Sequence, residues 1–169
     1  GKVAIVTGAG NGLGRSHALA LAERGAKVVI NDLGGARDGS GASSGAAQEV
    51  VTLIKEKGGE AFSHDANVAK FDEVEEMVQQ TMDKWGRIDI LINNAGILRD
   101  KSFAKMDLND FKLVMDVHLM GSTNCSKAVW NIMREQEYGR ILMTTSSSGM
   151  YGNFGQANYG AAKMAALGL

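Results

Sequence analysis

The sequence of 169 residues lacks proline altogether and contains one cysteine, Cys125. No proline marks a linker between domains, and a single cysteine excludes an internal disulfide and a cysteine-rich zinc site. The lone thiol, expected to be a small buried group, also fits a reducing compartment. His17 and His64 have no carboxylate or cysteine at ligand spacing. No metal site is therefore predicted.

Long apolar runs and blocks of like charge are missing too. No segment approaches the ~20 apolar residues of a membrane span, and the N-terminal stretch GKVAIVTGAG lacks the basic head and small-residue exit of a signal peptide. The 18 basic and 19 acidic residues are interspersed and give a net charge of -1. We therefore expect a soluble protein whose partners include neither nucleic acid nor a membrane.

Short apolar runs alternate with amphipathic helices, which is the pattern of a parallel sheet built from strand-helix-strand units. The length is sufficient for one core but not for two. Residues 1–169 are thus expected to form a single α/β domain with a doubly wound, Rossmann-type sheet. The expected strands are residues 3–7, 27–31, 61–64, 88–93 and 140–145.

Helices are expected between these strands. Apolar spacing predicts one helix over Ala47–Ile54 and another over Val74–Trp85, and Asp107 can cap a long helix that continues towards Met133. The segment 34–45, GGARDGSGASSG, has no periodicity and is predicted to be a mobile loop.

A glycine-rich turn follows the first strand in VAIVTGAGNGLGRS. Glycines there let main-chain N–H groups approach a phosphate at a helix N-terminus, although tight strand-to-helix packing alone also favours glycine. The candidate cofactor-binding residues in this turn are Gly8, Gly12, Leu13 and Gly14.

Asp32 closes the second strand about 20 residues further on, where a carboxylate can accept hydrogen bonds from the ribose of adenosine. The same charge would repel a 2'-phosphate, so NAD is expected as cofactor rather than NADP. Arg37 in the following loop could compensate such a phosphate, which keeps NADP as the lesser alternative. Asp32 could also simply begin a turn.

Two further strand ends carry candidate cofactor-binding residues. Asn67 and Val68 follow the third strand, where an amide and an apolar side chain can edge an adenine ring. Asn94, Ala95 and Gly96 follow the fourth strand and can line the nicotinamide ribose side of a crevice. A polar turn braced by its own amides is compatible with the same residues.

Ser146, Tyr159 and Lys163 are candidate catalytic residues, and the last two are also expected to contact the cofactor. Tyr159 and Lys163 lie four apart on a predicted helix and share one face. A phenol has a pKa of ~10, which a neighbouring ammonium and a cationic nicotinamide both lower. Ser146, expected at the end of the fifth strand, can hold the substrate oxygen while Tyr159 transfers the proton that accompanies hydride transfer. A tyrosine and a lysine four residues apart are common on ordinary helices. Together with the serine, the glycine turn and NNAG, the pair is a much more specific sign of a catalytic site.

In order and spacing, TGAGNGLG, NNAG, TTSSS and YGAAK resemble the motifs of the short-chain dehydrogenase/reductase family over the whole chain. Within that family, NDLGG, NNAGILRDKSFAKM, DVHLMGS and GMYGNFGQANYGAAK resemble the (3R)-hydroxyacyl-CoA dehydrogenase part of the peroxisomal multifunctional enzyme type 2 group and its bacterial relatives. The resemblance implies NAD-dependent oxidation of a (3R)-3-hydroxyacyl-CoA to the 3-oxoacyl-CoA in fatty-acid β-oxidation. It also implies a homodimer or homotetramer, peroxisomal in a eukaryote and cytoplasmic in a bacterium.

His118 departs from the wider family, most members of which carry an asparagine here that helps to hold a water beyond the lysine. A histidine titrates near neutral pH, so His118 could relay a proton itself and is a fourth catalytic candidate. The other interpretation is a packed helix histidine with backbone partners.

The chain stops at Leu169, within the catalytic helix, whereas the family's fold continues with two more strands and the helices that close over the substrate. We therefore expect that the C-terminal strands are absent here and that the residues belong to a longer protein. Two other hypotheses stay open. One is a short-chain dehydrogenase for another secondary alcohol or ketone, such as an oxoacyl-carrier-protein or a steroid, and the other is a truncated NAD-binding module without catalysis.

Overall fold

The computed structural model describes residues 1–41 and 45–169. Five strands form one sheet in the order β3-β2-β1-β4-β5, and every pairing is parallel. The α/β fold with a doubly wound parallel sheet that the sequence predicts is therefore confirmed. The strands are β1 (Val3–Thr7), β2 (Lys27–Asn31), β3 (Ala61–His64), β4 (Ile90–Asn93) and β5 (Arg140–Met143).

The first three strands have the predicted bounds, whereas β4 and β5 are shorter than predicted. β4 begins at Ile90, and the N–H of Ile88 donates to the side chain of Gln136, whose amide donates back to the carbonyl oxygen of Ile88. β5 ends at Met143 rather than at residue 145 because the chain then turns into the next helix.

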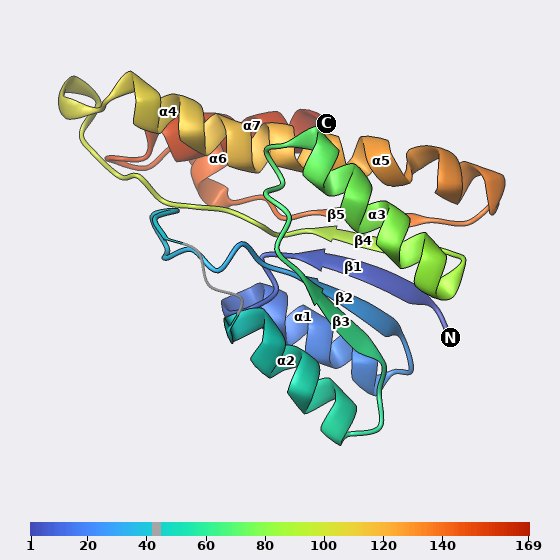
Figure 1. The fold of residues 1–169 in the computed structure, drawn as a ribbon. Coiled ribbons are helices and arrows are strands. Elements are labelled where there is room, and N and C mark those ends of the chain that lie inside the picture. The colour runs from blue at the N-terminus through green and yellow to red at the C-terminus, as the bar shows by residue number, and fades with distance from the viewer. Residues whose placement is uncertain (42–44) are drawn as a thin grey trace.

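Helices cover both faces of the sheet (Figure 1). α1 and α2 lie against one face and α3 and α5 against the other, while α4, α6 and α7 pack together beyond the carboxyl ends of the strands. The helices are α1 (Gly12–Glu23), α2 (Gly45–Glu56), α3 (Phe71–Trp85), α4 (Leu108–Met115), α5 (Gly121–Glu135), α6 (Ser147–Tyr151) and α7 (Ala157–Gly168), with a short 3-10 turn η1 (Phe103–Lys105). Part of the predicted loop 34–45, residues 42–44, lies outside the described residues.

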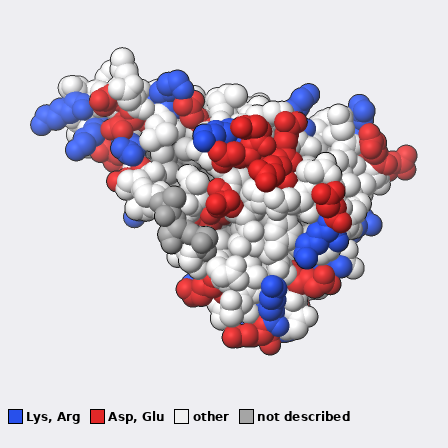
Figure 2. All heavy atoms as spheres, viewed as in Figure 1, with Lys and Arg blue, Asp and Glu red and all other residues white. Residues whose placement is uncertain are grey.

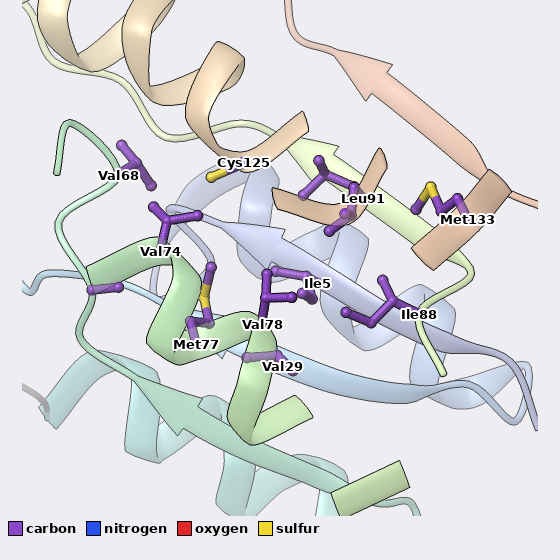
Figure 3. Packing of buried hydrophobic residues seen from close by; sticks show 12 residues of the cluster. Ile5, Val29, Val68, Val74, Met77, Val78, Ile88, Leu91, Cys125 and Met133 are labelled. Atoms are coloured by element: carbon purple, nitrogen blue, oxygen red, sulfur yellow. The ribbon is translucent and has the colours of Figure 1, made fainter. Parts of the chain in front are cut away.

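Two apolar clusters hold the helices on the sheet. The cluster in Figure 3 joins the sheet to α3 and α5, and its buried members include Ile5, Val29, Met77, Leu91 and Cys125. The other cluster joins the sheet to α1 and α2, with Val6, Ala18, Val28, Val50 and Ile54 among its members. Each fully buried aliphatic side chain stabilises the fold by roughly 1.5–3 kcal/mol. Cys125 is buried, as predicted, and burial raises the pKa of its thiol to about 12.

The long helical segment after β4 is capped by Asp107, as predicted, because its carboxylate accepts a hydrogen bond of 2.7 Å from the N–H of Asn109. The segment is not one continuous α-helix. α4 passes into a π-helical turn, η2 (Asp116–Met120), before α5 begins. Such turns are rare and occur frequently at functional sites, and this one contains His118.

Charges of both signs are spread over the surface. Figure 2 shows acidic and basic side chains side by side on one face of the molecule, in keeping with the net charge of -1. Among the helices that the described residues form, none combines the length and apolar character needed to cross a membrane.

Asp89 is a fully buried carboxylate immediately before β4. Its oxygens accept hydrogen bonds from the N–H of Val3, the ammonium of Lys2 and the guanidinium of Arg87. Burial alone would raise the pKa of Asp89, but the hydrogen bonds from Arg87, Val3 and Lys2 outweigh it and hold the pKa well below its usual range. The carboxylate therefore ties β1 to β4 at the amino ends of the strands.

Asp89→Ala is expected to lower the free energy of unfolding by about 3 kcal/mol at pH 7, since the N–H of Val3 and two cations lose their partner. Because the folded-state pKa is depressed, the contribution of Asp89 is complete above about pH 4 and is lost as the pH falls below that value. Urea unfolding should thus show a smaller difference between wild type and variant near pH 3 than at pH 7. The control Asp83→Ala, on the exposed surface of α3, should change stability by less than about 0.5 kcal/mol. Equal losses from the two variants would contradict this account.

Candidate active site

A cavity of about 650 Å³ lies at the carboxyl ends of β1 to β4. β1 pairs with β2 on one side and with β4 on the other. The connection from β1 to β2 and the connection from β3 to β4 therefore run to opposite sides of β1, and a crevice opens between the two halves. The predicted cofactor-binding residues that line this crevice are Gly8, Gly12, Asp32, Asn67, Val68, Asn94, Ala95 and Gly96.

The glycine turn contains glycines of two kinds. Gly12 has a φ of +54° with open space where a Cβ would lie, so it is required by its backbone conformation. Gly14 is required by packing, since a Cβ there would lie 2.1 Å from the carbonyl oxygen of Gly8. Gly10 makes room for Asp32, whose Oδ2 would lie 2.8 Å from a Cβ. The turn therefore leaves bare backbone at the N-terminus of α1, an arrangement that accommodates a phosphate.

The carboxylate of Asp32 is held between the glycine turn and the loop after β2. One oxygen accepts the N–H of Gly10 and the other accepts the N–H of Gly34, both at 2.7 Å. Asp32 thus begins a turn and also lines the crevice. A carboxylate has about four acceptor positions, so some remain for the hydroxyl groups of a ligand. The role of Gly10 was missed by the sequence analysis.

Asn94 and Thr7 join the glycine turn to the end of β4. The amide of Asn94 donates to the carbonyl oxygens of Thr7 and Gly8, at 3.0 and 3.1 Å. In return, the hydroxyl oxygen of Thr7 accepts the N–H groups of Asn94 and Ala95, each at 3.0 Å. Thr7 was not identified from the sequence, where its only signal is a hydroxyl at the end of an apolar strand.

Of the other residues predicted to bind the cofactor, Asn67 and Val68 line the crevice, whereas Leu13 does not. Asn67 accepts the N–H of Ala69 at 3.0 Å, which shapes the turn that presents Asn67 and Val68 to the crevice. Leu13, in the first turn of α1, is 66% exposed and is not among the residues that line the crevice. Contact between Leu13 and a cofactor stays a prediction.

Tyr159 and Lys163 share one face of α7. The ammonium of Lys163 lies 5.6 Å from the centre of the Tyr159 ring and donates to the carbonyl oxygen of Thr144 at 2.6 Å. Lys163 is buried, with 5% of its surface exposed, and burial lowers the pKa of its ammonium to about 8. The charged form still dominates at pH 7, where an ammonium beside a phenol stabilises the phenolate.

The sequence analysis placed Ser146 at the end of a strand, and this placement is wrong. β5 ends at Met143, and Ser146 is the N-cap of α6, where its hydroxyl oxygen accepts the N–H of Ser148 at 3.2 Å. α6 packs so closely on α7 that a Cβ at Gly149 would lie 2.8 Å from the backbone nitrogen of Met164. The cap therefore sits beside the helix that carries the tyrosine.

His118 packs edge-on against Tyr159, with ring centroids 5.2 Å apart and planes at 89°. Its Nε2 lies 3.1 Å from the nitrogen and 2.9 Å from the oxygen of Ile97, while its Nδ1 has no hydrogen-bond partner among the described residues. Gly96 makes room for the ring, since a Cβ there would lie 2.4 Å from Cε1. Burial, and then the charge of Lys163, lower the pKa of His118 to about 4, so the ring is neutral at pH 7. Its role in a proton relay stays a prediction.

The crevice fits a nicotinamide dinucleotide. The bare backbone of the glycine turn suits a pyrophosphate, and the carboxylate of Asp32 retains acceptor positions for a ribose. The volume of about 650 Å³ lies within the range of ordinary ligand pockets.

The family described as short chain dehydrogenase matches residues 2–169, so the chain belongs to the short-chain dehydrogenase family. The members of this family are typically oxidoreductases, and NAD or NADP is their class of cofactor. A crystal structure of a short chain dehydrogenase from Mycobacterium avium superposes with a TM-score of 0.87 at 44% identity, covering 97% of this chain and 59% of that one.

Two curated relatives are similar in sequence to this chain over 99% or more of its length. Peroxisomal multifunctional enzyme type 2 of Mus musculus is 54% identical over 172 residues, which are 100% of this chain and 23% of that protein. The 3-oxoacyl-[acyl-carrier-protein] reductase of Synechocystis sp. is 48% identical over 167 residues, which are 99% of this chain and 64% of that protein. The chain thus spans less than two thirds of each relative. The resemblance predicted from the motifs is confirmed.

Lys163→Met is expected to raise the free energy of unfolding by about 2 kcal/mol at pH 7, because it removes a desolvated charge and keeps the volume of the side chain. The folded pKa of about 8 lies below the unfolded value of ~10.4, so between these values the unfolded state binds more protons and the wild type gains stability as the pH rises. The advantage of the variant should therefore shrink from pH 7 to pH 10 in urea unfolding. Lys55→Met, on the exposed face of α2, is the control. An advantage that stays constant with pH would refute this interpretation.

Proposed function

We propose that the protein oxidises a (3R)-3-hydroxyacyl-CoA to the corresponding 3-oxoacyl-CoA with NAD as cofactor. The observation that carries the proposal is the buried ammonium of Lys163, which lies 5.6 Å from the ring of Tyr159 on α7, the helix against which α6 with its N-cap Ser146 packs. His118 links this group to the crevice, because it packs against Tyr159 and against Ile97, a residue of the crevice wall.

Oxidation of a secondary alcohol removes a hydride from carbon and a proton from oxygen. Bound NAD supplies the hydride acceptor. Tyr159 takes the proton from the hydroxyl group, and the ammonium of Lys163 favours the phenolate that this step needs. Ser146 donates a hydrogen bond to the substrate oxygen; its hydrogen is available because its Oγ accepts the N–H of Ser148.

The relatives support an acyl thioester as substrate. One relative is a peroxisomal multifunctional enzyme type 2 by name, and another acts by name on a 3-oxoacyl group. A 3-oxoacyl thioester is the product of the proposed oxidation, so the name of the Synechocystis reductase agrees with chemistry at the third carbon of an acyl chain.

Reduction of a 3-oxoacyl-carrier-protein is the second candidate function, favoured by the 48% identity to the Synechocystis reductase. The same side chains would act in reverse, with Tyr159 giving the proton. The carboxylate of Asp32 argues against it where the reductant is NADPH, because it would face the 2'-phosphate. A module that binds NAD without turnover is the third candidate.

We also propose a homodimer or homotetramer as the working form, and a peroxisomal location in a eukaryote or a cytoplasmic one in a bacterium. These proposals rest on the resemblance to the multifunctional enzymes.

The test of the function uses the full-length protein. NADH should form with (3R)-3-hydroxyacyl-CoA and not with the (3S) enantiomer, and Tyr159→Phe should lower kcat by about 10³-fold while the Kd for NAD stays within about threefold. The control Tyr138→Phe, at the amino end of β5, should leave both constants unchanged. Faster turnover of a 3-oxoacyl-carrier-protein with NADPH would favour the second candidate. NAD binding without turnover of either substrate would favour the third.

Asp32→Asn is expected to weaken the binding of NADH several-fold and to strengthen that of NADPH about tenfold, since it removes the charge that repels a 2'-phosphate and keeps an acceptor oxygen. Titration of nucleotide fluorescence measures both dissociation constants. Asp83→Asn, on the exposed face of α3, is the matched control. Unchanged discrimination in Asp32→Asn would show that this carboxylate does not select the cofactor.

A further inference from the structure

Residues 35–39, here called the strap, form one wall of the crevice and end against the segment that follows β4. The strap residues that line the crevice are Gly35, Ala36, Arg37 and Gly39. The carbonyl oxygen of Arg37 accepts the N–H of Leu98 at 3.0 Å. Gly39, with a φ of +84°, lies so close to Ile97 that a Cβ would be 3.1 Å from its Cγ2. The strap thus bridges the end of β2 and the chain beyond β4.

Arg99 fastens the strap to α4. Its Nε donates to the carbonyl oxygen of Asp38, and its Nη1 donates to the carboxylate of Asp110 at 3.0 Å. The side chains of Arg99 and Asp110 are only 28% and 29% exposed, so this ion pair is shielded from water on most of its surface. One guanidinium therefore joins the strap, which follows β2, to α4, which follows β4.

The backbone around Arg99 is joined to the start of α7. The carbonyl oxygen of Arg99 accepts the amide of Asn158 at 2.9 Å, and the N–H of Lys101 donates to the carbonyl oxygen of Gly155 at 2.9 Å. Asn158 is fully buried, and its own Oδ1 accepts the N–H of Tyr159 at 2.8 Å. The position of the tyrosine is thus set by the same segment that receives the strap.

We propose that Arg99 is a positioning residue that couples occupancy of the crevice by a nucleotide to the placement of Tyr159. The inference rests on the proposed function, which puts a nucleotide in the crevice and proton transfer on Tyr159. A ligand that packs against the strap holds the carbonyl oxygen of Asp38 against the guanidinium. Arg99 then has both of its partners in place, and its backbone carbonyl holds Asn158 and the first turn of α7.

A purely structural role of Arg99 predicts a different response of α7 to the nucleotide. If Arg99 only fastened α4, its loss would loosen the start of α7 equally with and without nucleotide. Coupling requires that the nucleotide itself stabilises the start of α7 and that this effect passes through Arg99. Hydrogen exchange of the backbone measures the local stability directly and needs no turnover.

The test compares the full-length wild type with Arg99→Met, which keeps the length of the side chain and removes its donors. Exchange of peptides that span residues 156–160 is measured by mass spectrometry without NAD and at an NAD concentration that saturates each protein. In the wild type, NAD should slow this exchange about tenfold, a typical size for coupling between sites. In Arg99→Met the slowing should be lost, and the Kd for NAD should rise about tenfold.

Matched variants distinguish loss of the coupling between nucleotide and α7 from general damage to the fold. Arg24→Met removes an exposed arginine at the end of α1, far from the crevice, and should keep the full effect of NAD. Asp110→Asn keeps an acceptor for Arg99 but removes its charge, so it should retain part of the effect. If circular dichroism shows that Arg99→Met does not fold, Asp110→Asn and Arg99→Lys carry the test, and an undiminished effect of NAD in both overturns the proposal.

The other outcomes are equally decisive. NAD-dependent slowing that persists in a folded Arg99→Met protein overturns the coupling. NAD binding without slowing in the wild type also overturns it, while leaving the proposed function intact. Absence of NAD binding to the wild type removes the proposed function and the coupling with it.

Discussion

The hydrogen bonds that join the end of β1 to the end of β4 are the constraint on which the site depends. Asn94 caps the carbonyl oxygens of Thr7 and Gly8, and the hydroxyl of Thr7 receives the backbone of the segment that contains Asn94. β1 lies at the point where the strand order changes direction, so these bonds fix the glycine turn relative to the chain that leads towards α4 and α7. They extend the pairing of β1 with β4 into the loops that form the two halves of the crevice.

The chemistry of the site is built from polar groups that the fold buries at some cost. Lys163, His118 and Asn158 are all buried, and each has a hydrogen bond to backbone. Burial disfavours the charged forms of the lysine and the histidine, which leaves a neutral imidazole and a readily deprotonated ammonium beside one phenol. Functional sites often concentrate such perturbed groups, because stability there is exchanged for reactivity.

Much of the fold could be predicted from the sequence, because alternating apolar runs and helix signals are local. The bounds of the first three strands and the cap at Asp107 are examples. The roles of individual glycines could not be predicted, since Gly10 and Gly14 are required by contacts with distant segments. For the same reason the sequence missed Thr7 and the π-helical turn, and it misplaced Ser146, whose capping position depends on where β5 stops pairing.

The proposed oxidation requires direct transfer of a hydride from the third carbon of the substrate to a nicotinamide, and an isotope label on that carbon reports the transfer. The full-length protein would be given NAD and a (3R)-3-hydroxyacyl-CoA carrying deuterium on its third carbon, and the nucleotide product would be analysed by mass spectrometry. One deuterium is expected in the reduced nucleotide for each thioester oxidised. Oxidised thioester without deuterium in the nucleotide, or no oxidation at all, would contradict the proposed function.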